Sequence, residues 1–160
     1  MRASQPETMQ KPPLSTRSAA QNDSDEPPRA HRAIILVVER DPHVRDLETF
    51  FLNEAGFGVE FATDGAAALE MAREIKPDII ITEVLVPKLD GLALCRSVKR
   101  DPELSDTVVL IFSILAAEGR AREAGADAFL MKPLAEQRLV STVRTLLAKR
   151  GAAAPSTKAK

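Results

Sequence analysis

Features that specify several common kinds of protein are absent from this sequence. The single cysteine, Cys95, excludes an intrachain disulfide framework, and its place in an apolar periodic segment predicts a small buried side chain. No run of about 18 apolar residues is present, and residues 1–30 lack the continuous apolar core of a secretory signal. We therefore expect a cytoplasmic protein that does not associate with membranes.

An excess of charge of either sign is also missing. The sequence has 22 Lys and Arg against 23 Asp and Glu, a formal net charge of −1, so no strong field would attract nucleic acid. A glycine-rich phosphate loop, a Ser-His-Asp arrangement and a cluster of zinc ligands are absent as well. These absences predict a protein that is not an enzyme and that does not bind nucleic acid.

The composition instead favours one folded domain between two polar ends. The chain has 160 residues, 44% of them hydrophobic, which suffices for one compact core. Five of the 11 prolines precede Ala33, among Ser, Gln, Asn and Asp. We predict a disordered tail over 1–32, a domain over 33–150 and a flexible tail over 151–160.

Short aliphatic runs alternate with segments of helical period, a pattern typical of a parallel sheet covered on both faces. The residues Asp41-Pro42 and Asp64-Gly65 are typical helix starts. The predicted strands are 34–38, 58–62, 79–82, 108–112 and 128–131, and the predicted helices are 42–55, 65–75, 91–100, 116–124 and 134–149. The prediction is therefore an α/β fold whose ligands would gather at the carboxyl ends of the strands.

Those strand ends carry a set of polar residues that resembles the receiver domain of two-component response regulators. The resemblance covers about 34–149 and rests on Glu39-Arg40-Asp41, Glu83, Pro87-x-x-Asp90-Gly91, Ser113, Gly125-Ala126-Asp127 and Lys132-Pro133. It implies a doubly wound, flavodoxin-like five-stranded parallel sheet in the order 2-1-3-4-5. It also implies an aspartate after the third strand that accepts a phosphoryl group from a histidine kinase, and a magnesium ion held by that aspartate and by acidic residues after the first strand.

Two central positions depart from this pattern. Glu83 stands in place of the phospho-acceptor aspartate, and Arg40 stands in place of a metal-ligand acid beside Glu39. Phosphoryl transfer needs a nucleophile at a fixed distance and a cation that neutralises the phosphoryl oxygens. Glu83 is one methylene longer than aspartate, and Arg40 adds positive charge. We expect Arg40 to pair with Glu83 and to replace the cation, so that the magnesium site is lost and no cofactor is held.

Other residues of the pattern are retained. Ser113 and Lys132 match the hydroxyl and the lysine that contact phosphoryl oxygens, and Phe129 matches the aromatic residue that reports the active state. The Lys132-Pro133 bond is a candidate cis peptide, as in the family. Ile114 is bulky where the family usually has a small residue. Simpler interpretations stay open: Ser113 as a polar strand end, Phe129 as a core residue, and Arg40 extending into water.

The sequence therefore supports two functional hypotheses. In the first, a stand-alone atypical receiver acts in two-component signalling as a phosphorylation-independent protein–protein interaction module, with Glu83 either mimicking the phosphorylated acceptor or inert. In the second, it is a functional phosphoreceiver of a histidine-kinase phosphorelay with an unconventional acceptor. The expected partners are signalling proteins, either a histidine kinase or a downstream effector, and a homodimer is left open. The short segment between Ser113 and Gly125 predicts a stunted fourth helix.

Overall fold

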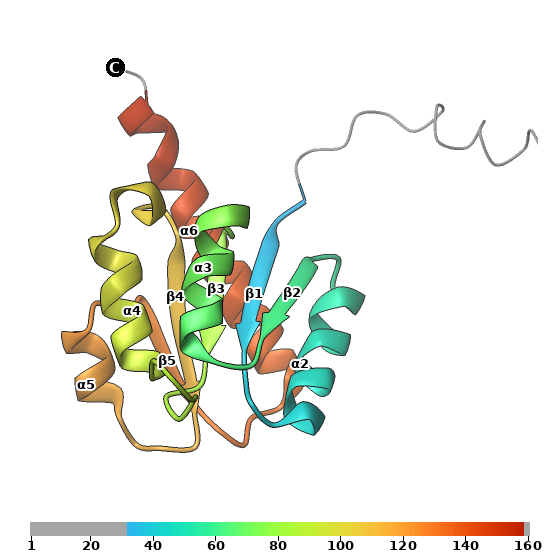
Figure 1. Ribbon diagram of the computed structural model, residues 1–160. Helices are drawn as coiled ribbons and strands as arrows, with labels where there is room; N and C mark the ends of the chain where they lie inside the picture. The colour runs from blue at the N-terminus through green and yellow to red at the C-terminus, as the bar shows by residue number, and fades with distance from the viewer. Residues whose placement is uncertain (1–31, 159–160) are drawn as a thin grey trace, which may run out of the picture. The chain divides into compact units, whose positions relative to one another are not determined.

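A five-stranded parallel sheet forms the centre of the molecule (Figure 1). The computed structural model describes residues 32–158. Its strands are β1 (Ile34–Val38), β2 (Gly58–Ala62), β3 (Ile79–Thr82), β4 (Val108–Ser113) and β5 (Ala128–Met131). They lie in the order β2-β1-β3-β4-β5, which confirms the predicted doubly wound topology.

Helices cover both faces of this sheet. They are α2 (Pro42–Glu54), α3 (Gly65–Ile75), α4 (Gly91–Arg100), α5 (Glu118–Glu123) and α6 (Glu136–Lys158), with a short 3-10 helix at Pro102–Leu104. Helices α2 and α6 pack on one face, and α3, α4 and α5 pack on the other (Figure 1). The carboxyl ends of the strands point toward the bottom of Figure 1, where the loops that carry the predicted site residues gather.

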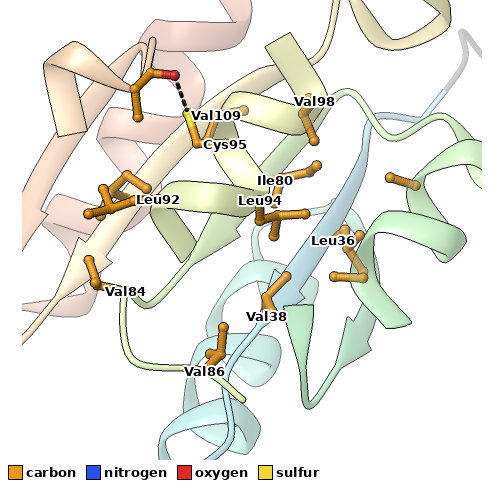
Figure 2. Close-up of a cluster of buried hydrophobic side chains, with 14 of the residues drawn as sticks. Leu36, Val38, Ile80, Val84, Val86, Leu92, Leu94, Cys95, Val98 and Val109 are labelled. Atoms are coloured by element: carbon orange, nitrogen blue, oxygen red, sulfur yellow. Dashed lines mark hydrogen bonds between the residues drawn. The ribbon is translucent and has the colours of Figure 1, made fainter. Parts of the chain in front are cut away.

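Alternation along the buried strands divides the core into two layers. Ile35 and Val37 of β1 face α2 and α6, whereas Leu36 and Val38 face α3 and α4. Figure 2 shows the second layer, in which Cys95 is fully buried and its Sγ donates a hydrogen bond to the carbonyl of Ala124 at 3.4 Å. Burial raises the pKa of this thiol to about 11. The prediction of a buried, structural cysteine is confirmed.

The helix starts that flank the site are fixed by aspartate caps. Asp41, Asp64 and Asp90 each accept hydrogen bonds from backbone N–H groups in the first turn of α2, α3 and α4. At the start of α4 the backbone of Gly91 packs so closely that a Cβ there would lie 2.2 Å from the carbonyl oxygen of Glu83. Only glycine allows this approach. The backbone that carries Glu83 is thus held between β3 and the first turn of α4.

Differences from the predicted elements are confined to their ends. Helix α5 has only six residues, as expected of a stunted helix, and no side chain caps its first turn. The Lys132-Pro133 peptide is cis. Helix α6 extends to Lys158, beyond the predicted end at 149. We predicted that end from the point where the periodic pattern gives way to a polar end at Gly151, but Ala152, Ala153 and Ala154 favour helix. The flexibility of 151–160 stays a prediction.

Two further expectations concern the chain as a whole. The tail predicted over 1–32 lies outside the described residues except for Arg32. Within residues 32–158, no helix is long and apolar enough to cross a membrane.

Candidate functional site

The ammonium group of Lys132 lies at the centre of a cluster of three carboxyl groups beside the strand ends. Its Nζ is 2.6 Å from Glu39 Oε1, 3.2 Å from Glu83 Oε2 and 3.9 Å from Glu48 Oε2. Lys132 directly follows β5, and the carboxylates come from the ends of β1 and β3 and from the middle of α2. Parallel strands that end at one edge bring these distant residues together.

Glu83 is buried, and both of its carboxylate oxygens are engaged. Oε1 accepts hydrogen bonds from the Ser113 hydroxyl and from the backbone N–H of Val84, the latter at 2.6 Å. Oε2 accepts from the backbone N–H of Ile114 at 3.1 Å and faces Lys132. The extra methylene of glutamate lets the carboxylate reach β4 while it still bonds to the residue that follows it.

These contacts decide the ionisation of Glu83. Burial acts to raise the pKa of its carboxyl, but the Ser113 hydroxyl, the Lys132 charge and the backbone N–H groups together lower that pKa below its ordinary value. For Lys132, burial acts to lower the pKa, and the hydrogen bond from Lys132 to Glu39 together with the nearby carboxylates raises it. Glu83 and Lys132 therefore form an ion pair at neutral pH.

Arg40 does not take the position that we expected. Its side chain is exposed, and among the described residues no ion pair joins it to Glu83. Lys132 occupies the space between Glu39 and Glu83 instead, because its side chain extends from the end of β5 across the end of β4 and reaches both carboxylates. An exposed guanidinium stays hydrated, and an exposed ion pair would stabilise the protein by only about 0–1 kcal/mol over that hydrated state. The expected Arg40–Glu83 pair is therefore wrong, and the alternative in which Arg40 extends into water is the one observed.

Glu39 is held in the cluster by two contacts. Its Oε1 faces Lys132, and its Oε2 accepts a hydrogen bond from the backbone N–H of Asp41 at 3.0 Å. Asp41 itself caps α2 and is exposed. The two carboxylates near the strand ends, Glu39 and Glu83, thus share one ammonium group, which leaves one negative charge. A magnesium ion, which is commonly held by one or two carboxylates and water, would have to compete with Lys132 for both of these carboxylates.

Glu48 is the functional candidate that the sequence reasoning missed. It is buried on α2, and burial raises the pKa of its carboxyl to about 8, with Lys132 opposing and Glu39 and Glu83 adding to the rise. A signal was present in the sequence. Glu48 falls on the stripe of α2 that also carries Val44, Phe51 and Leu52, where an apolar residue is expected.

The remaining predicted residues divide into two groups. Ser113 is fully buried and bonded to Glu83, so it is part of the cluster. Ile114 is exposed beside it and donates only its backbone N–H. Phe129 packs partly buried on the α3–α5 face of the sheet, away from α2 and α6. Its role as a reporter of an active state stays a prediction.

Comparison with known proteins agrees with this geometry. Residues 35–144 match the family model of the response regulator receiver domain. The chain is 39% identical over 114 residues to the response regulator MprA of Mycobacterium ulcerans, covering 71% of this chain and 49% of that protein. It is 33% identical over 116 residues to the DNA-binding dual master transcriptional regulator RpaA of Synechocystis, covering 71% of this chain and 48% of that protein. The chain thus spans about half the length of these relatives.

A solved structure gives the same result for the fold. The signal receiver domain of a signal transduction histidine kinase from Syntrophus aciditrophicus superposes with a TM-score of 0.70 at 36% identity, covering 73% of this chain and 91% of that chain. The sheet order, the lysine after β5 and the family match lead to one conclusion. This chain belongs to the response regulator receiver domain family of two-component signalling.

Proposed function

We propose that this receiver acts as a phosphorylation-independent protein–protein interaction module, in which Glu83 replaces the phosphorylated acceptor. One observation carries the proposal: the Glu83 carboxylate contacts both Ser113 and Lys132. In the family that the sequence resembles, the hydroxyl and the lysine at these two positions contact the phosphoryl oxygens. A glutamate that is permanently bonded to both groups favours the hypothesis that Glu83 mimics the phosphorylated acceptor over the hypothesis that it is inert. Glu83 supplies one negative charge, whereas a phosphoryl group supplies about two.

The same contacts argue against phosphoryl transfer to Glu83. A nucleophilic oxygen must be free to attack in line, but each oxygen of Glu83 already accepts hydrogen bonds or faces Lys132. The cation that would neutralise the incoming phosphoryl group would compete with Lys132, which already contacts Glu39 and Glu83. We therefore propose that the magnesium site is lost and that the unconventional phosphoreceiver is the weaker hypothesis.

Exposed apolar side chains beside the cluster support a role in binding a signalling protein. Leu85, Ile114 and Met131 are all exposed next to the ends of β3, β4 and β5. Leu85 and Ile114 line one hollow with Glu39 and Glu83, and exposed apolar side chains beside a buried polar site are typical of an interaction face. Of the relatives above, RpaA is a DNA-binding regulator, but this chain covers only 48% of that protein. The partner proposed for this chain is therefore a protein and not DNA.

The experiment combines mass spectrometry with partner capture. Acetyl phosphate and magnesium should leave the intact mass of the protein unchanged. A partner captured from native cells without a phosphodonor should bind wild type and be lost in Glu83→Gln, which keeps the size of the side chain and removes its charge. Glu60→Gln, an exposed change on β2, is the matched control and should retain the partner.

Two results would contradict the proposal. A labile adduct of phosphoryl mass on Glu83 would establish the phosphoreceiver hypothesis. A partner that binds only after treatment with acetyl phosphate, or that binds Glu83→Gln as well as wild type, would exclude Glu83 as a permanent mimic.

A further inference from the structure

A pocket of about 420 Å³ opens beside the carboxylate cluster, between α2, the end of β4 and the start of α6. Its volume lies within the range of about 300–1,000 Å³ that small-molecule sites occupy. Its walls are mostly apolar and include Leu47, Phe51, Phe112, Ile114, Leu134 and Leu139. The pocket is therefore shaped for the apolar body of a small ligand.

One carboxyl group that lines this apolar pocket, that of Glu48, has only a distant and shared partner. The side chain of Glu48 is 7% exposed, and among the described residues no hydrogen bond to its carboxyl is found. The nearest cation, Lys132, is 3.9 Å away, which is too far for a hydrogen bond. Lys132 is already engaged by Glu39 and Glu83 at shorter distances. A buried carboxyl left in this condition is costly unless another group supplies the missing contact.

We propose that this pocket binds a small amphipathic amine, with its apolar part between α2 and α6 and its ammonium group on the carboxylate of Glu48.

The charges around the pocket select a cation over an anion. Glu48 and Glu136 line the pocket, and its one lining cation, Lys132, is bonded to Glu39 and Glu83 outside it. Because Glu39 and Glu83 already neutralise Lys132, an added anion would meet a surplus of negative charge. An added ammonium group would instead form a charge-assisted hydrogen bond in a poorly solvated place.

The proposed ligand site does not depend on the proposed function. It uses Glu48 and the apolar side chains of α2 and α6, whereas the mimic depends on Glu83 and Ser113. Either hypothesis can fail while the other holds.

The test compares three probes of nearly equal shape on the full chain: phenethylamine, neutral phenethyl alcohol and anionic 3-phenylpropionate. Titrations at about pH 8.5, which is above the pKa of about 8 of Glu48 and below the pKa of about 10 of an alkylammonium, keep most of both groups charged. Saturable binding of the amine is expected, with shifts of the NMR signals of Phe51, Leu134 and Leu139. The alcohol should bind at least about tenfold more weakly, because it lacks the charged hydrogen bond.

Two variants assign the binding to Glu48. Glu48→Gln should weaken the amine by about tenfold or more and leave the alcohol nearly unchanged. Glu54→Gln, the same change on an exposed position of α2, should bind the amine as wild type does. The inference is overturned if wild type shows no saturable amine binding, if either of the other probes binds as well as the amine, or if Glu48→Gln keeps wild-type amine affinity. The probe comparison on wild type stands even if a variant folds poorly.

Discussion

Lys132 Nζ lies 3.2 Å from Oε2 of Glu83, so a lysine from the last strand end provides the counter-charge for the residue at the acceptor position. The side chains of both residues are mostly buried, at 12% and 6% exposure. A pair that is this well shielded from water is coupled more strongly than a surface pair.

A double-mutant cycle should show whether Glu83 is coupled to Lys132 or to Arg40. Lys132→Met should destabilise the fold by about 3 kcal/mol, because it leaves buried carboxylates without a counter-charge. Combined with Glu83→Gln, it should show a coupling free energy of about 1 to 3 kcal/mol in urea unfolding. Arg40→Ala combined with Glu83→Gln should be additive within about 0.5 kcal/mol. Strong coupling to Arg40 instead would mean that Arg40 pairs with Glu83 in solution.

The buried Glu48 should make stability fall as the pH rises. Its pKa is raised from 4.5 to about 8 in the folded state, so between these values the folded protein binds more protons than the unfolded chain. Ionisation in the folded state is penalised, and the free energy of unfolding should drop by on the order of 3 kcal/mol between about pH 5 and pH 8. Glu48→Gln should flatten this slope in chemical denaturation, whereas Glu54→Gln should not. An unchanged slope in Glu48→Gln would assign the effect to another group.

Ser113→Ala should lower the free energy of unfolding at neutral pH, because it removes a hydrogen bond to the Glu83 carboxylate. The Ser113 hydroxyl helps to hold the pKa of Glu83 below its ordinary value, which contributes stability above the unfolded pKa that is lost as the pH falls. Without that hydroxyl the folded pKa should move upward, and the free energy of unfolding at pH 7 should fall by about 1 to 2 kcal/mol. Carboxyl NMR signals of Glu83 would follow the pKa directly. Ser113→Thr, which keeps the hydroxyl, should retain the low pKa.

Restoring both acidic residues should restore a response to magnesium. Wild type should show no saturable step at low millimolar magnesium, because Lys132 already pairs with both Glu39 and Glu83 and would compete with the ion. The double variant Arg40→Asp with Glu83→Asp shortens the acceptor and adds a carboxylate, so its melting temperature should rise with magnesium by linkage. Each single variant is the control and should respond less. Equal responses in wild type and the double variant would show that these two positions do not govern the metal.

The fold could be predicted almost completely because its signals are local. Aliphatic runs such as Ile79–Thr82 and caps such as Asp41 and Asp90 determine strands and helix starts within a few residues. The end of α6 was missed because propensity is a weak guide where packing no longer decides.

The site was predicted only in part because the ion pairs between its residues depend on how the side chains are oriented in the folded protein. The strand-end pattern identified Glu83, Ser113 and Lys132, but the choice between Arg40 and Lys132 as the partner of Glu83 depends on which side chain reaches inward. Glu48 belongs to a helix rather than to a strand end, so the rule that located the other residues did not include it.

The close approach of Gly91 to Glu83 limits where this receiver can move. The carbonyl of Glu83 faces the backbone of Gly91, and the N–H of Gly91 donates to the carbonyl of Val84 at 2.9 Å. The stretch of chain that carries the acceptor position therefore cannot shift without unseating the first turn of α4. Beyond Ser113, the backbone N–H groups of Ile114 and Leu115 are bonded to Glu83 and Ser113, but no side chain caps the first turn of the six-residue helix α5. Amide exchange should thus be slow at Val84 and Gly91 and faster over 118–120, which makes the first turn of α5 the part of this edge that opens most readily.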